Sequence, residues 1–290
     1  MSLFLPLLPL IAQVGPFTAP GTNGTPFPER VERPGKARYM SAAPVRAGKA
    51  QACLDAVEDD AEEAVDTAND WLVSAKPDEK PEANLCLGMA QSRLEVWGAA
   101  ETAFLAGRDV AGSDRLMRAR LGAMAGNAAL AGGRPDRALE ALDPARDEAK
   151  GLADQHLIAT IALDRARAFV ALKREGEAEA PLAEARDAAP NNPEAWLLSA
   201  TLSRREGKLA DAQQRIERAA DLLPIDPDIG LEAGVIAVLS GHDEAARKSW
   251  ESVVKAAPDS PAAATAKGYL AQLGPAPISN PATTKMEPGR

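Results

Sequence analysis

An interval of 34 residues repeats in the C-terminal half of this chain, and it constrains the fold more than any other feature. Pro193, Pro227 and Pro261 are spaced by this interval. Small, turn-forming and apolar residues shift with them: Ala200, Gly234 and Gly268; Gly207 and Gly241; Ala212 and Ala246; Ile216 and Trp250; Pro224 and Pro258. A period of this length is typical of solenoids, in which each helical unit packs mainly on its neighbours.

One such unit, residues 193–224, predicts two helices joined by a turn. Pro193 is compatible with the start of the first helix, because the N–H that proline lacks has no helical partner there. Gly207 can adopt the left-handed conformation that ends this helix. Pro224 ends the second helix. One face of that second helix carries Ala212, Ile216 and Ala219.

The unit resembles the tetratricopeptide repeat. The residues at that family's signature positions are Trp196, Ala200, Gly207, Ala212, Ile216, Ala219 and Pro224. The next unit has Gly234, Gly241, Ala246, Trp250 and Pro258 at these positions. Gly230 and Val253 replace its usual aromatic residue and alanine. The resemblance implies an all-α fold: a right-handed superhelical solenoid of about six helix–turn–helix pairs plus a closing helix, over residues 45–273.

Upstream, the repeat is less regular but keeps its phase. Residues 87–104, 132–139 and 166–190 indicate further units. We expect the first helix pair at residues 47–58 and 60–75, the closing helix at 261–273 and a disordered tail at 274–290.

Composition supports helices and excludes other classes. Alanine supplies about 60 of the 290 residues, while aromatic residues make up 4%. Alanine has the highest helix propensity and allows close helix packing. The net charge is −9, which argues against a nucleic-acid partner. The sequence has no apolar run of the roughly 20 residues that a membrane span requires.

The N-terminus has two interpretations. Residues 1–14 contain an apolar stretch of the length found in a secretory signal sequence, although no Lys or Arg precedes it. The alternative is a disordered or loosely docked terminus. Residues 15–44 are rich in Pro and Gly, which predicts an extended linker.

Cys53 and Cys86 lie 33 residues apart, close to one repeat. They are therefore expected at nearly matching places on the first helices of adjacent pairs. A disulfide between them would stabilise the fold by about 3–4 kcal/mol and would fit an oxidising, periplasmic or secreted location. The alternative is two buried thiols in a cytoplasmic protein.

No motif points to catalysis. The two histidines, His156 and His242, have no zinc-ligand spacing, and the sequence lacks a Walker loop or a nucleophile elbow. We expect no enzyme activity, no cofactor, no metal and no small-molecule substrate. The acidic run at residues 55–66 has two interpretations: a solvated helix face, or a surface that attracts a basic partner.

The resemblance implies a concave groove lined by the first helix of each pair. The positions that it assigns to this inner face are Leu85, Met89, Arg93, Asn127, Leu130, Leu163, Arg167, Val170, Leu197, Thr201, Arg204, Arg205, Leu231, Val235, Val238 and Leu239. We call them the inner-face residues.

These positions combine arginines with an apolar patch at residues 231–239. They favour a peptide partner with acidic and apolar side chains, since arginine matches carboxylates in shape. Alternatively, Arg204 and Arg205 pair with neighbouring glutamates, and the patch packs on the closing helix. The expected function is a protein-interaction scaffold, for instance in envelope assembly or polysaccharide export. A cytoplasmic adaptor, or a ligand binder or enzyme with unrecognised chemistry, is the alternative.

Overall fold

The computed structural model describes residues 47–274 of the chain. All regular elements of the described residues are helices. The expected signal sequence at 1–14, the linker at 15–44 and the tail beyond Gly274 lie outside these residues. Contacts divide the chain into two compact units, with the boundary between Ala195 and Trp196.

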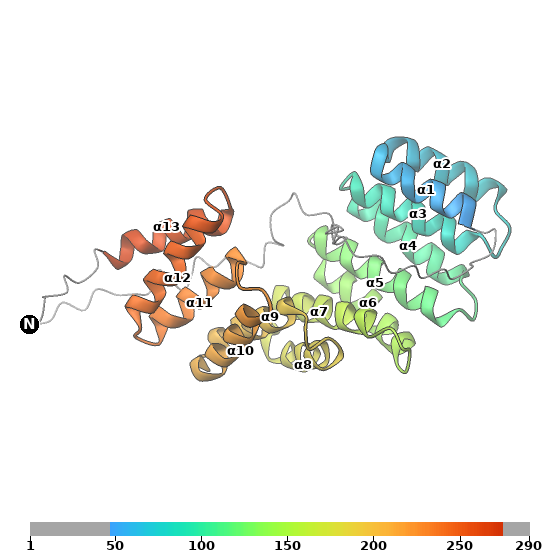
Figure 1. The fold of residues 1–290 in the computed structure, drawn as a ribbon. Coiled ribbons are helices and arrows are strands. Elements are labelled where there is room, and N and C mark those ends of the chain that lie inside the picture. Colours follow the sequence, from blue (N-terminus) through green and yellow to red (C-terminus); the bar gives the residue numbers. More distant parts are fainter. Residues whose placement is uncertain (1–46, 275–290) are drawn as a thin grey trace, which may run out of the picture. The chain divides into compact units, whose positions relative to one another are not determined.

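Unit 1 contains four helix pairs, which Figure 1 colours from blue to yellow-green. Their bounds are α1 Ala47–Asp59, α2 Ala61–Ser74, α3 Lys80–Arg93, α4 Trp97–Val110, α5 Arg115–Ala131, α6 Pro135–Ala149, α7 Gln155–Ala171 and α8 Glu179–Ala188. A short 3₁₀ helix, η2 Glu175–Glu177, lies between α7 and α8. Each helix packs on the next. The first helices of adjacent pairs are also in contact, for example α1 with α3.

Unit 2 contains most of α9 and the last four helices. The bounds are α9 Pro193–Arg205, α10 Leu209–Leu222, α11 Pro227–Leu239, α12 Asp243–Ala256 and α13 Pro261–Leu273. Here, too, packing follows the order of the chain: α11 packs on α10 and α12, and α13 covers α11 and α12.

Small residues let the helices approach closely. A Cβ added at Gly88 on α3 would overlap the ring of Phe104 on α4. In unit 2, a Cβ added at Gly234 would overlap the indole of Trp250, which is 1% exposed. The repeated small residues therefore make room for a large side chain from the second helix of the same pair.

Ion pairs join one repeat to the next along the second helices. Glu101 on α4 is buried and lies 2.8 Å from Nη1 of Arg134 and 3.0 Å from Nη2 of Arg137, at the start of α6. On α6, Nε of Arg146 lies 2.8 Å from a carboxylate oxygen of Glu184 on α8. These pairs fix the stacking of one helix pair on the next.

The structure confirms the predicted helical-repeat fold. Its described residues form six helix pairs and a closing helix. Gly207 and Gly241 have φ values of 76° and 79°, so both adopt the left-handed conformation that ends a first helix. Two turns have another residue in this conformation: Glu95, with a φ of 58°, between α3 and α4, and Lys173, with a φ of 63°, after α7. The short helix η2 follows Lys173 and lengthens the turn before α8.

Candidate functional site

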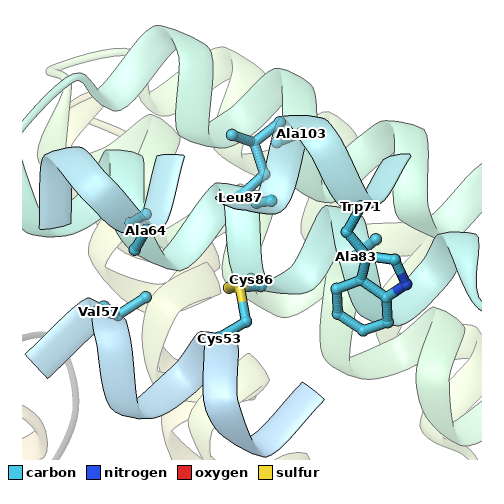
Figure 2. Packing of buried hydrophobic residues seen from close by; sticks show 10 residues of the cluster. Cys53, Val57, Ala64, Trp71, Ala83, Cys86, Leu87 and Ala103 are labelled. Carbon is cyan, nitrogen blue, oxygen red and sulfur yellow. A yellow bond between two sulfur atoms is a disulfide. The ribbon is translucent and has the colours of Figure 1, made fainter. Parts of the chain in front are cut away.

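Cys53 on α1 and Cys86 on α3 form a disulfide, with their Cα atoms 6.1 Å apart. Each residue is 1% exposed. Figure 2 shows the bond inside an apolar cluster, with Val57 on one side and Trp71 and Ala83 on the other. The bond ties the first helix of the described chain to the first helix of the next pair.

The acidic run is spread over α1 and α2, and its side chains are exposed. Asp60 has a structural role: its carboxylate accepts hydrogen bonds from the N–H groups of Glu62 and Glu63 and caps α2. The other acids of the run form no ion pair with a described residue. This placement fits a solvated, strongly negative face.

The inner-face residues of α3 differ in exposure. Met89 is half-buried and packs against the clusters on both sides of α3, together with Leu85 on one side. Met124 on α5 packs against the same cluster as Leu85. Arg93, at the end of α3, is exposed and forms no ion pair with a described residue. Leu85, Met89 and Met124 therefore form a partly apolar surface. The cation of Arg93 lies at the end of the same helix, α3.

A polar chain runs across the first helices of unit 1. Nδ2 of Asn127 on α5 donates to Oδ2 of Asp164 on α7 over 3.2 Å. Nη1 of Arg167 donates to the other oxygen of Asp164 over 2.5 Å, and its Nη2 donates to Glu194 in the first turn of α9. Arg167 is thus held between two carboxylates.

The electrostatics of this chain follow from burial. Asp164 is 1% exposed, and burial raises the pKa of Asp164 more than Arg167 and Asn127 lower it. Burial opposes the charge of Arg167, but Asp164 and Glu194 together raise the pKa of this guanidinium. Two carboxyls share one cation, which leaves one negative charge poorly compensated.

A similar ion pair crosses the first helices of unit 2. Nε of Arg204 on α9 donates to Oε1 of Glu232 on α11 over 2.6 Å. The side chains are 8% and 11% exposed. Tyr269 on α13 lies close enough for both charges to act on its hydroxyl, although burial is the main cause of the raised pKa of Tyr269.

The apolar patch of α11 packs on the closing helix. Val235 is buried, and Leu231 and Val238 pack beside it against Trp250 and residues of α13. Val238 and Leu231 remain half-buried, and Leu239 is 41% exposed at the end of α11. The patch is therefore mostly used inside unit 2.

The inner-face residues of α9 have different surroundings. Leu197 is half-buried and packs against the cluster around Ile216. Thr201 is 9% exposed and donates its hydroxyl to the carbonyl of Leu197 over 3.1 Å. Arg205 is exposed at the helix end. Leu163 and Val170 on α7 are buried, so they cannot offer area to a partner.

Arginine on the inner face is thus less available than the sequence suggested. Arg167 and Arg204 are each paired with a glutamate of the next first helix. The acidic partners Glu194 and Glu232 were not identified from the sequence. The sequence did contain a usable pattern: the glutamates follow their arginines by 27 and 28 residues, which is nearly the same spacing in two successive repeats.

Other features of the described residues offer little chemistry. A shallow pocket between α3 and α4 is lined by neutral side chains, among them Asn84, Gln91 and Thr102. In the described part of the chain, no three His, Cys, Asp or Glu residues are grouped so that they could hold a metal ion. No helix described between residues 47 and 274 has the length and apolarity of a membrane span.

Solved structures with the same arrangement of helices identify the fold. PilW, a widely conserved type IV pilus biogenesis factor, matches with a TM-score of 0.63 and 19% identity, over 77% of this chain and 99% of PilW. PilF of Pseudomonas aeruginosa matches with a TM-score of 0.62 and 15% identity, over 77% of this chain and 97% of PilF. The chain has the fold of a tetratricopeptide-repeat protein.

A third tetratricopeptide-repeat structure, YrrB, is described as having an unusual peptide-binding site. It matches with a TM-score of 0.50 and 18% identity, over 76% of this chain and 99% of YrrB. No protein-family model matches the sequence, and no curated protein sequence matches it. The tetratricopeptide-repeat assignment therefore rests on the repeated signature residues and on the helix arrangement.

Proposed function

We propose that this protein is a non-enzymatic scaffold that binds a protein or peptide partner through the inner-face residues that stay exposed or half-buried, in an oxidising compartment such as the bacterial cell envelope. The binding proposal rests on the side chains that remain accessible on the first helices, which are apolar residues and an arginine. In unit 1, Met89 stays half-buried and Arg93 is exposed; in unit 2, Leu197, Leu231 and Val238 stay half-buried.

On α3, the half-buried Met89 and the exposed Arg93 one turn further along the helix suit a partner segment that carries apolar and acidic residues. Methionine adds adaptability, because its flexible side chain fits differently shaped apolar groups. The peptide-binding site attributed to YrrB by its description supports this use of the fold.

Two observations support the compartment. The Cys53–Cys86 disulfide is of a kind that persists where thiols are oxidised. PilW, which shares the fold, is described as a type IV pilus biogenesis factor, which is consistent with work at the cell envelope. The signal sequence expected at residues 1–14 would deliver the chain there.

Site-specific photo-crosslinking in cells tests the binding proposal. A crosslinking amino acid at Met89 should capture a partner, whereas one at Lys248, an exposed residue on the second helix α12, should not. Arg93→Glu should reduce the capture at Met89, because it reverses the charge that meets an acidic partner. Equal capture from Lys248, or capture that Arg93→Glu leaves unchanged, would contradict the proposal.

Alkylation tests the compartment. Protein purified from cells with thiols trapped at lysis should, when denatured without reductant, show no mass increase from alkylation of Cys53 or Cys86. After reduction it should gain two alkyl groups. Two thiols that alkylate without reduction would instead favour the cytoplasmic adaptor.

A further inference from the structure

We propose that α1 is a redox-controlled cap. It packs on α2 and α3 when Cys53 and Cys86 are joined, and it leaves them when both are thiols, while the rest of unit 1 stays folded. This inference does not depend on the partner or on the inner-face residues. Three properties of the described residues lead to it: few apolar contacts of α1, a repulsive charge arrangement, and an independent attachment of α2.

The apolar contact of α1 is small. Among its described side chains, only Cys53 and Val57 are buried, and Ala50, Leu54 and Ala56 are partly buried. By contrast, α3 buries eight residues. A helix of 13 residues is marginal by itself in water, so α1 depends on what attaches it to its neighbours.

The charges of the first pair oppose its docking. Residues 47–75 hold one basic side chain, Lys49, against eight acidic ones: Asp55, Glu58, Asp59, Asp60, Glu62, Glu63, Asp66 and Asp70. Glu58 and Asp59 lie at the C-terminal end of α1, where the helix dipole disfavours a negative charge. They also come close in sequence to the acids that begin α2, so the two helices repel each other at their junction.

The helix α2 has its own attachment to α3. Ala64, Ala68 and Trp71 of α2 are buried in the cluster that contains Ala83 and Leu87 of α3 (Figure 2). These contacts do not pass through α1. Loss of α1 would therefore uncover the side of the cluster next to Cys86 without removing α2.

The chemistry is thiol–disulfide exchange with a dithiol reductant. Both sulfurs are buried, so the exchange begins when α1 opens locally and uncovers them. A thiolate of the reductant then attacks one sulfur and forms a mixed disulfide, and the other cysteine leaves as a thiolate that takes up a proton. The second thiol of the reductant then displaces the remaining cysteine, and the reductant ends as a disulfide. Two electrons and two protons have moved to Cys53 and Cys86. A protein disulfide as oxidant reverses the exchange and restores the cap.

Hydrogen exchange on the full chain, with and without dithiothreitol as the dithiol, tests the proposal. Reduction should lower the hydrogen-exchange protection of amides 50–59 at least about tenfold. The protection of the amides in α5 and α6 should change less than about threefold. The double variant Cys53→Ala, Cys86→Ala should resemble the reduced protein and show no response to dithiothreitol. Unchanged protection of α1 after reduction, or a joint loss over α1, α2 and α3, would overturn the cap.

A charge variant tests the repulsion. In reduced protein at low salt, Glu58→Gln with Asp59→Asn should restore at least about threefold of the lost protection in α1, as should added salt in the unsubstituted protein. The matched control is Asp109→Asn, which also neutralises an exposed acid in the last turn of a helix, α4. It should leave α1 unchanged. If the double variant has no effect on α1, or the same effect as Asp109→Asn, charge repulsion does not control α1.

Discussion

Arg204 on α9 and Glu232 on α11 form a nearly buried ion pair, with 2.6 Å between Nε and Oε1. The two helices belong to successive repeats, so the pair connects them across the first-helix row. One nitrogen of the guanidinium, Nη2, is buried without a hydrogen-bond partner among the described residues. The pair therefore depends on a single strong contact to offset the cost of removing two charges from water.

Breaking this pair should destabilise the protein more than removing it altogether. Glu232→Leu leaves the Arg204 charge buried without compensation and should lower the free energy of unfolding by about 3 kcal/mol. Combining it with Arg204→Met should recover most of that loss, because no uncompensated charge remains. Urea unfolding followed by circular dichroism measures both.

The neighbouring residue supplies the control. Arg205→Met at an exposed position should change the free energy of unfolding by less than about 0.5 kcal/mol. A double variant that is less stable than Glu232→Leu alone would show that the pair contributes through packing rather than through charge compensation.

Asp164 should make stability depend on pH in an unusual direction for a carboxyl group. Its pKa is raised in the folded state, so the folded chain holds the proton more tightly than the unfolded chain does. The stability that this group contributes is complete below its unfolded pKa, near 3.9, and is lost as pH rises through its folded pKa.

The matching variant is Asp164→Asn, which cannot titrate. The free energy of unfolding of the unsubstituted protein minus that of the variant should decrease as pH rises from about 4 toward 7. Urea unfolding across this range checks the sign. A difference that grows with pH would show that Arg167 outweighs burial.

Gly234 and Gly268 occupy the same place in successive repeats but should respond to alanine in opposite ways. A Cβ at Gly234 meets the indole of Trp250, whereas a Cβ at Gly268 on α13 meets no atom within 4 Å. Gly234→Ala should therefore lower the free energy of unfolding by about 1–3 kcal/mol through overpacking. Gly268→Ala should raise it by about 0.5–1 kcal/mol through helix propensity. Thermal unfolding compares them, and a loss of stability from Gly268→Ala would indicate that another surface covers α13.

The repeat period and its turn residues, which are visible in the sequence alone, predict the helical-repeat fold. The closing helix, Pro261–Leu273, matches its expected range, and the second helix differs by one residue at each end, at Ala61–Ser74 instead of 60–75. These features are local: glycine, proline and the spacing of apolar residues act within one helix pair.

Tertiary structure alone decided which side chains remain available. The sequence places Arg204 and Arg205 side by side, yet the side chain of Arg204 is nearly buried against Glu232, whereas Arg205 lies at an exposed position. It also gives Gly234 and Gly268 the same position in the repeat, although, among the described residues, only Gly234 has a following second helix to accommodate. Pairing and burial depend on groups about one repeat away, and their geometry is set by how successive helix pairs stack rather than by the sequence around each residue.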